Sequence, residues 1–350
     1  MLRYFTAGES HGPMEVAILE GIPSGLELSG KDIQKDLDKR KGGSGRGGRG
    51  HIELDKVKIV SGVRNGKTIG SPIALLVENL DFVNWKEKTV LNTNPRPGHA
   101  DLVGCLKYHL SDIRDVLERA SARETVMRVA VGSVCRKLIG LLGIEITSRV
   151  IQIGKVFESQ KLMEAEILNA IKNKDTLGGV IEITAHNVPP GLGSHVHYDR
   201  KLDGLLSQHL MSIPSVKAVE IGDGIKNSEK YGSEVQDEIY YKSTAFYRKT
   251  NRAGGIEGGI TNGENIICRV YHKPLSTLGH PLNTVDIITK KTTKALVERS
   301  DVCVIFRAGI ISEAAMAFVL SQATLEKFGG DSISEFKRNF EGYKKNLTTI

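Results

Sequence analysis

The sequence predicts an α/β protein of the α+β type, in which central helices pack against sheets. One observation is the stretch 122–142, where apolar residues cover most faces of a helix and charges are few. A helix of this kind lies in the middle of a protein. The other is a weak internal echo, because a strand, a Pro-Gly turn and a helix occur at 16–40 and again at 181–210. The echo suggests a duplication into two sheet-plus-helix halves around the central helices, although a chance similarity would look the same.

Composition places the chain among soluble globular proteins. Its 350 residues are 40% apolar and 25% charged, and this length suits one large domain or two ordinary ones. Glycine is abundant, with 38 residues, while aromatic residues make up only 5%, so we expect many tight turns and close approaches of backbone to a ligand. The net charge of +7 favours anionic partners, which include nucleic acids, membranes and phosphorylated metabolites.

No sequence pattern indicates secretion, a metal site or a membrane span. The four cysteines lie far apart without a CxxC pair, which predicts reduced thiols. The N-terminus lacks the apolar core of a signal peptide, and no run approaches the ~20 apolar residues that cross a bilayer. His195 and His197 alternate, but surface histidines at this spacing seldom bind metal. We therefore expect a cytoplasmic protein that uses no metal and no membrane.

The elements of the first half follow from apolar patterning and turn signals. In chain order we expect a buried strand at 16–19, a turn at 23–26, a helix at 31–40 capped by Ser29 or Asp32, a glycine-rich loop at 41–50, strands at 57–61 and 73–77 on either side of an Asn65-Gly66 hairpin turn, an irregular segment at 79–97, and the helix at 122–142.

The second half is expected to continue the mixture of strands and helices. The predicted elements are strands at 143–146 and 181–183, a turn at 190–192, a helix at 198–210, strands at 218–221, 265–271 and 302–306, and a helix at 313–325. The tail after Asp331 is charged and polar, so we expect 331–350 to be peripheral to a single domain that spans 1–350.

A histidine between small residues, His11, stands in the segment Gly8-Glu9-Ser10-His11-Gly12. Because histidine titrates near neutral pH, it can donate a proton to a substrate that the glycines allow to approach. The alternative is a turn histidine that only hydrogen-bonds to backbone.

A second candidate is His99, which follows Arg96-Pro97-Gly98 in a loop stiffened by two prolines. Asp101, two residues later, can orient the imidazole or stabilise its charged form. This loop therefore suits proton transfer, although a purely structural histidine stays open. A short polar turn at 119–125, which opens the long helix, is the kind of helix start that binds anions.

Basic and glycine-rich segments predict an anion site. Arg40, Arg46 and Arg49 lie in or beside the glycine-rich loop, where arginine forks can bind phosphate or carboxylate. Binding of a nucleic-acid backbone is the rival, although the loop contains no aromatic residue for stacking; a solvated loop is the third alternative. Two Gly-Gly pairs at 254–259 allow backbone to lie against a planar or phosphorylated ligand. Lys273 with the hydroxyls that follow it suits a phosphate.

Taken together, these motifs resemble the chorismate synthase family. The matching segments occur in the family's order and cover residues 3 to about 325. They are 8–13, 40–49, 96–101, 119–125, 220–224, 251–263, 273–277 and 299–304. One such segment would be weak evidence, whereas the ordered set is highly specific.

The resemblance implies a β-α-β sandwich, with helices between two mainly antiparallel sheets, and a homotetramer. It also implies reduced FMN as cofactor and conversion of 5-enolpyruvylshikimate 3-phosphate to chorismate and phosphate by anti 1,4-elimination, without net redox change. Such chemistry agrees with the residues, since loss of phosphate requires cationic groups and an acid and the cofactor supplies electrons transiently. NADPH is implied only for members that reduce their own flavin.

The resemblance also assigns residues. By it, His11 would protonate the leaving phosphate and His99 the reduced flavin, with Asp301 assisting proton removal. Arg40, Arg46 and Arg49 would bind substrate anions or a nicotinamide phosphate. FMN would contact Arg119, Ala120, Ser121, Pro214, Ser215, Gly258, Lys273, Pro274, Leu275, Ser276, Thr277 and Arg299.

The sequence departs from the usual motifs of the family at two places. The usual His-Asp-Pro-Cys of the family is Ser300-Asp301-Val302-Cys303 here, and Gly309-Ile310-Ile311 replaces a usual Pro-Val before the last core helix. These changes concern the local shape near Asp301.

Two alternative functions remain at this point. They are a nucleic-acid-binding protein, without a yellow cofactor, and a flavin-free lyase or phosphotransferase, which would require a divalent metal.

Overall fold

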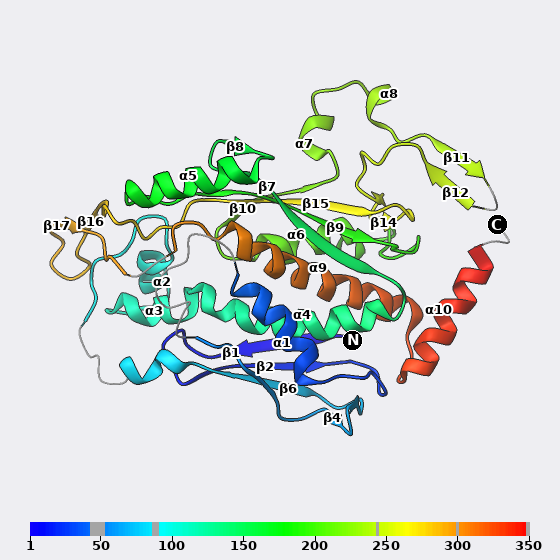
Figure 1. Cartoon of the computed structure of the whole chain (residues 1–350), viewed down its shortest axis with the longest axis horizontal. Helices are drawn as coiled ribbons and strands as arrows, with labels where there is room; N and C mark the ends of the chain where they lie inside the picture. The colour runs from blue at the N-terminus through cyan, green and yellow to red at the C-terminus, as the bar shows by residue number, and fades with distance from the viewer. Residues whose placement is uncertain (43–52, 86–90, 243–244, 299–300, 348–350) are drawn as a thin grey trace.

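The computed structural model describes residues 1–42, 53–85, 91–242, 245–298 and 301–347. Two antiparallel sheets enclose a layer of helices, as Figure 1 shows, and a single hydrophobic core extends through all three layers. The predicted β-α-β sandwich is therefore confirmed.

The first sheet has four antiparallel strands in the order β1-β2-β6-β3. They are β1 (Arg3–Ala7), β2 (Met14–Glu20), β3 (Val57–Ile59) and β6 (Ile73–Glu78). In β2 every second residue, including Ala17 and Leu19, is buried, which is the period of a strand with one face on a core. Asn65 and Gly66 have φ of 51° and 73° and connect the short strands β4 (Val63–Arg64) and β5 (Lys67–Thr68), so the predicted hairpin turn is confirmed.

The second sheet has five antiparallel strands in the order β10-β15-β9-β7-β8. They are β7 (Glu145–Ile153), β8 (Val156–Phe157), β9 (Gly179–His186), β10 (Val216–Ile221) and β15 (Ile266–His272). Alternate residues of β15 are buried, and most of β9 is buried because it lies in the middle of the sheet.

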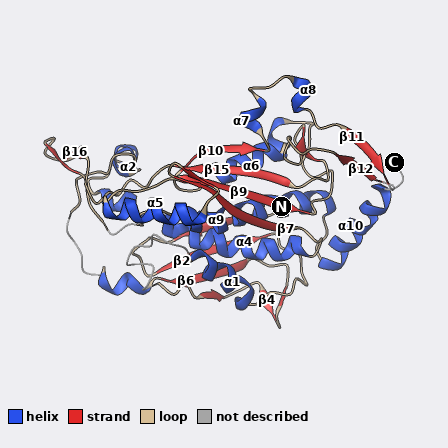
Figure 2. Ribbon diagram, turned by 45° about the horizontal axis from the view of Figure 1, so that its top comes forward, coloured by secondary structure: helices blue, strands red, loops and turns tan. Residues whose placement is uncertain are grey.

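Helices form the layer between the sheets (Figure 2). They are α1 (Gly30–Arg40), α4 (Thr125–Gly140), α6 (Leu202–Met211) and α9 (Ile305–Phe328). Twelve of the 16 residues of α4 are buried, which confirms that the long apolar stretch is a central helix. It packs closely on α9, because a Cβ on Gly132 would lie only 2.3 Å from the Cβ of Ala314.

The strand order supports the duplication that the sequence echo suggested. Apart from short surface elements, the first half runs β1-β2-α1-β3-β6-α4 and the second half runs β7-β9-α6-β10-β15-α9. Within each sheet the four strands pair in the order first, second, fourth, third. Both halves therefore share one topology, and each contributes one of the two central helices. These helices begin at the same end of the molecule, on the left of Figure 1.

The remaining elements lie outside this framework. They are the 3₁₀ turns η2 (Leu80–Asn84), η3 (Ala122–Glu124) and η4 (Tyr198–Arg200), the helices α2 (Asp101–Tyr108), α3 (Ile113–Ala120), α5 (Gln160–Lys172), α7 (Gly224–Asn227), α8 (Gly232–Val235) and α10 (Ile333–Leu347), and the hairpins β11 (Ile239–Lys242) with β12 (Ala245–Arg248), β13 (Ile256–Glu257) with β14 (Ile260–Thr261), and β16 (Asn283–Val285) with β17 (Thr292–Lys294).

The expected strand at 302–306 was wrong. Only Cys303 makes a β-bridge, with Leu177, and α9 begins at Ile305 instead of near residue 313. A short apolar run such as Val302–Phe306 has the same composition in a buried strand and in a buried helix, so its pattern does not distinguish the two.

The tail beyond Asp331 contains α10, a helix that the sequence analysis did not predict. Its Phe336 and Phe340 are buried, and their rings contact Phe328 at the end of α9. The charged residues of this segment occupy the outer face of an amphipathic helix, which explains why its composition suggested a peripheral tail.

Helix α9 is long and apolar enough to span a membrane by length and composition, unlike what the sequence suggested. However, 83% of its most apolar window is buried inside the protein. It is thus placed like the core helix of a soluble protein.

Candidate active site

A cavity of about 840 Å³ lies where α4 and α9 begin. Thr125 of α4 and Val304, Arg307 and Ala308 at the start of α9 line it. Helix N-termini present unpaired N–H groups and a positive dipole end, which favour anions. The predicted site residues that line this cavity are His11, Arg40, His99, Ala120, Ser121, Pro214, Ser215, Lys273, Pro274, Leu275, Ser276, Thr277 and Asp301.

His11 is held by a carboxylate on α3. Its Nδ1 lies 2.8 Å from Oε1 of Glu118, and its backbone N–H donates to Oε2 of the same residue at 2.6 Å. Burial raises the pKa of Glu118, but the hydrogen bonds from His11 outweigh burial and lower it overall. An ionised Glu118 accepts the Nδ1 proton, so Nε2 is the nitrogen with which His11 can transfer a proton.

His99 has a similar partner in Asp101, the first residue of α2. The Nδ1 of His99 lies 2.5 Å from Oδ1 of Asp101, and Nε of Arg96 donates to Oδ2 at 2.8 Å. Burial alone would raise the pKa of Asp101, but the hydrogen bonds of His99 and Arg96 lower it well below its usual range. Asp101 is fully buried and ionised, so it favours the Nδ1–H tautomer of His99, and Nη2 of Arg96 lies 3.3 Å from Nε2.

Arginines and carboxylates form a second group at the end of α1. Arg40 donates to Oδ2 of Asp55 at 3.2 Å and to Oγ1 of Thr125 at 3.0 and 3.2 Å. Burial lowers the pKa of Arg40 to about 10, so it stays charged at neutral pH. Arg123 also binds Asp55, and its Nε donates to Asn79 at 2.7 Å. Both arginines face the cavity.

Lysine and hydroxyl groups line the cavity beyond the end of β15. Nζ of Lys273 donates to the carbonyl of Gly98 and lies 3.1 Å from Oγ of Ser276. Gly98 has φ of 76°, and a Cβ there would lie 3.2 Å from Nζ of Lys273. Glycine at this position thus leaves room for the ammonium group. Arg96 donates to Oγ1 of Thr277 at 3.0 Å, which connects this group with His99.

Asp301 lies beside the first turn of α9. Its carboxylate accepts from both terminal nitrogens of Arg307, at 2.6 and 3.2 Å. The geometry is a bidentate ion pair, and Asp301 and Arg307 both line the cavity.

Comparisons with known proteins identify the family. A family model described as Chorismate synthase matches residues 2–325. The chain is 53% identical to the chorismate synthase of Thermoanaerobacter pseudethanolicus (strain ATCC 33223 / 39E), with 98% of each chain covered. The chain belongs to the chorismate synthase family. It is also 47% identical to the chorismate synthase of Geobacter metallireducens (strain ATCC 53774 / DSM 7210 / GS-15), with both chains fully covered.

A solved structure agrees with this assignment. The structure entitled "Crystal Structure of Chorismate Synthase" superposes with a TM-score of 0.82 at 37% identity, covering 100% of this chain and 99% of the other. Membership in the chorismate synthase family makes the protein an enzyme, a lyase. The comparisons give no support to the nucleic-acid alternative.

Several residues assigned by the family resemblance lie elsewhere or outside the described part. Arg119 does not line the cavity; its guanidinium donates to the carbonyls of Thr6 and Gly8, at 2.9 and 3.3 Å, and thereby fixes the loop that carries His11. Gly258 lies exposed in the turn between β13 and β14 and is not among the lining residues. Arg46, Arg49 and Arg299 lie outside the described residues.

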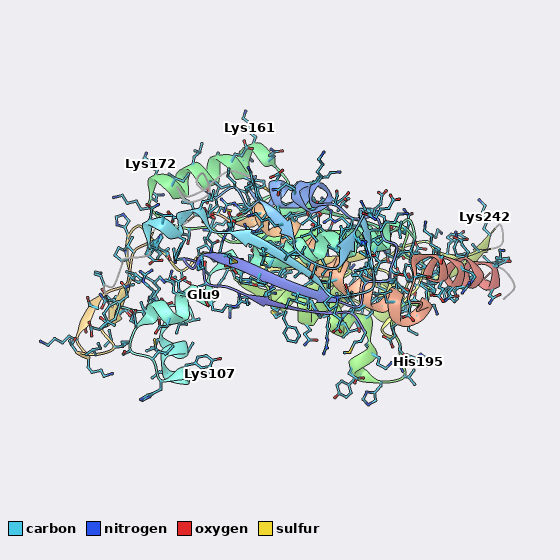
Figure 3. The ribbon with its side chains drawn as sticks, turned by 90° about the horizontal axis from the view of Figure 1, so that it is seen from below. Glu9, Lys107, Lys161, Lys172, His195 and Lys242 are labelled. Carbon is cyan, nitrogen blue, oxygen red and sulfur yellow. The ribbon has the colours of Figure 1, made fainter. Side chains whose placement is uncertain are left out.

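The histidine pair outside the family motifs does not join the site. His195 is on a loop that projects from the body of the molecule, away from Glu9, which belongs to the segment of His11 (Figure 3). His197 is exposed and pairs with Asp199 at 2.7 Å. Within the described ranges of the chain, no group of three or more His, Cys, Asp or Glu side chains is arranged to hold a metal ion.

Among the lining residues that escaped the sequence analysis are Trp85, Glu298, Arg123 and Arg307, and so did Glu118, which holds His11. Glu118 is 107 positions from His11, and no sequence spacing could join them. Arg123 had a signal, because it stands within the polar turn that opens the central helix.

Proposed function

We propose that the protein converts 5-enolpyruvylshikimate 3-phosphate to chorismate and phosphate by anti 1,4-elimination, as a carbon-oxygen lyase that uses reduced FMN. The observation that carries the proposal is the pair of histidines, each held by an ionised carboxylate, in one cavity with a cationic lining. Loss of a phosphate needs cations that bind the anion and an acid that protonates it. Within the described residues, this cavity provides both.

The cavity also suits FMN. Lys273, Ser276, Thr277 and Ser215 offer an ammonium and three hydroxyls, which are groups that bind a phosphate. Leu117, Ile213, Leu275, Leu296, Val297 and Ile311 offer apolar surface for a planar ring. When bound, reduced FMN supplies the transient electron density for departure of the phosphate.

We assign FMN contacts to the residues that the family resemblance names. Those lining the cavity are Ala120, Ser121, Pro214, Ser215, Lys273, Pro274, Leu275, Ser276 and Thr277, and Arg299 completes the set. Arg119 acts through the loop of His11, and Gly258 can contribute only from a place outside this cavity.

His11 is the acid that protonates the leaving phosphate. Glu118 holds the imidazole at Nδ1 and stabilises its cation, so that the transferable proton is on Nε2. Arg40, with Arg46 and Arg49, binds the substrate's anionic groups or the phosphate of NADPH if that cofactor reduces the flavin.

We assign the second proton transfer to Nε2 of His99, because its Nδ1 is engaged with Asp101. Asp301, which pairs with Arg307, assists removal of the substrate proton. We further propose that 1–350 acts as one domain, assembles as a homotetramer and works in the cytoplasm without a nucleic-acid or membrane partner.

An anaerobic assay tests the proposal. Purified protein is mixed with reduced FMN and 5-enolpyruvylshikimate 3-phosphate, and chorismate and inorganic phosphate are measured. We expect both products in equal amounts with reduced FMN and neither with oxidised FMN alone. If oxidised FMN plus NADPH also gives product, the protein reduces its own flavin. A protein that forms no chorismate in the presence of reduced FMN does not have the proposed activity.

A further inference from the structure

The only tryptophan of the chain, Trp85, lies against His11. The centroids of the two rings are 4.0 Å apart, with an angle of 41° between the ring planes. Both residues line the cavity. Glu118 holds His11 at its Nδ1 edge, whereas Trp85 contacts its ring.

The indole is itself fixed in place. Its Nε1–H donates to Oδ2 of Asp81 at 3.0 Å, and Asn84 donates to Oδ1 of the same carboxylate at 2.8 Å. Asp81 is 1% exposed, and the neighbouring backbone N–H of Leu80 donates to Glu53 at 3.0 Å. Such anchoring distinguishes Trp85 from a mobile surface aromatic.

A cation also lies over the indole. Cζ of Arg114 is 4.8 Å from the ring centroid, and its guanidinium pairs with Glu298 at 3.2 Å and lies 3.8 Å from Glu118. Among the described residues, the charged groups that contact these two rings include Asp81, Arg114 and Glu118. An aromatic face attracts a guanidinium, and it equally attracts an imidazolium.

We propose that Trp85 is a positioning residue for His11. The hydrogen bond to Glu118 restrains the imidazole at its Nδ1 edge, and the indole, in contact with the ring, restricts its rotation from one side. Nε2 is thereby kept in the direction of the substrate, and orientation of this kind accounts for a large part of catalytic rates. The role in turnover rests on the proposed function, whereas the ring contact does not.

Fluorescence of the full chain without flavin or substrate tests the contact. Protonated imidazole quenches a neighbouring indole, so we expect Trp85 emission to fall about twofold in a step when the pH is lowered from roughly 8 to 5.5. His11→Gln should abolish this step, and His99→Gln, which changes the other cavity histidine, should keep it. A step that persists unchanged in His11→Gln would overturn the contact.

Substitutions at Trp85 test the positioning role. In the anaerobic assay, Trp85→Leu should lower kcat about 10-fold, a moderate loss for a misplaced catalytic group, while KM and the affinity for FMN change less than about twofold. Trp85→Phe, which keeps a flat ring, should restore kcat to within about threefold of the parent protein.

The outcomes separate the two proposals. Unchanged kcat in Trp85→Leu, or an equal loss in Trp85→Phe, would overturn the positioning role. If the parent protein itself forms no chorismate, the proposed function fails, and the fluorescence step still decides whether Trp85 and His11 are in contact. Far-UV circular dichroism of both variants verifies that they are folded.

Discussion

At the scale of residues, two carboxylates, the buried Asp101 and the part-buried Glu118, give the candidate site its chemistry. Glu118 and Asp101 both have lowered pKa values, because hydrogen bonds from His11 and from His99 and Arg96 outweigh the effect of burial. Each therefore stays ionised at neutral pH and leaves one histidine nitrogen for proton transfer. This arrangement predicts that the imidazoles, not the carboxylates, exchange protons with ligands.

Removing either imidazole should lower the rate of chorismate formation strongly. His11→Ala and His99→Ala should each reduce chorismate formation by roughly 10- to 1000-fold, the range for loss of an acid-base group. Phosphate release with reduced FMN is the measurement. His197→Ala is the control, since this histidine is exposed and lies outside the cavity lining, and it should retain full turnover. Near-normal turnover in both cavity variants would refute their roles.

Glu15 predicts a pH dependence of stability. It is 1% exposed, and its carboxylate oxygens have no hydrogen-bond partner within the described part of the chain. Burial, opposed by Arg123 and Arg119, raises the pKa of Glu15 to about 7. Because the folded pKa exceeds the unfolded one, the associated stability is fully present below about pH 4.3 and is lost as the pH rises through 7.

Glu15→Gln should therefore raise the free energy of unfolding by roughly 1–3 kcal/mol at pH 8 and have little effect at pH 5. Urea unfolding at both pH values measures the difference. Glu27→Gln, at an exposed position, serves as the comparison and should change neither value. An equal effect of Glu15→Gln at both pH values would contradict a titrating carboxylate.

At the scale of elements, α10 connects the two halves. Ser24, in the turn after β2, exchanges backbone hydrogen bonds with Asp331 and Ile333, each at 2.9 Å. The hydroxyl of Tyr343 donates to the carbonyl of Pro190 at 2.9 Å. Ser24 and Pro190 lie in the turns after β2 and β9, which are equivalent strands of the repeated topology. The segment that contains α10 therefore contacts both halves at matching places.

Truncating the core of α10 should weaken the protein markedly. Phe336→Ala removes a fully buried ring and should lower the free energy of unfolding by about 3–5 kcal/mol. Denaturant titration measures it. Phe157→Ala, at a side chain that is 63% exposed, is the matched control and should cost less than about 1 kcal/mol. Equal losses in both variants would contradict the packing of α10.

Local patterns predicted elements well where burial alternates or is nearly complete. Strand β2, helix α4 and the Asn65-Gly66 turn each have a periodicity or turn residue that only one local structure satisfies. The start of α9 and the nature of α10 were missed, because an apolar run and a charged segment acquire their structure from what they pack against. The contact of His11 with Trp85 was invisible for a similar reason, since tertiary folding alone brings these two segments together.

At the scale of the molecule, the halves share one core. Leu19 of the first sheet, Val131 of α4 and Ile183 of the second sheet all belong to the same buried cluster. Such continuity supports the single domain that we propose. It also implies that neither half can keep its central helix buried without the other.

The chain should accordingly unfold as one unit. We expect Trp85 emission, which reports on the first half, and far-UV circular dichroism, which reports on the whole chain, to give coincident urea transitions. An intermediate in which the indole is already exposed while much of the helical signal remains would show that the halves unfold separately.

The shared topology has a consequence for how the site is divided. Equivalent helices, α4 and α9, begin on either side of the cavity, yet the first is flanked by Arg40 and Arg123 and the second by Asp301 and Arg307. The backbone framework is thus close to symmetric, whereas the side chains on the two sides of the cavity differ. A ligand in this cavity therefore meets two unlike surroundings, with two arginines that share Asp55 on one side and the Asp301–Arg307 ion pair on the other.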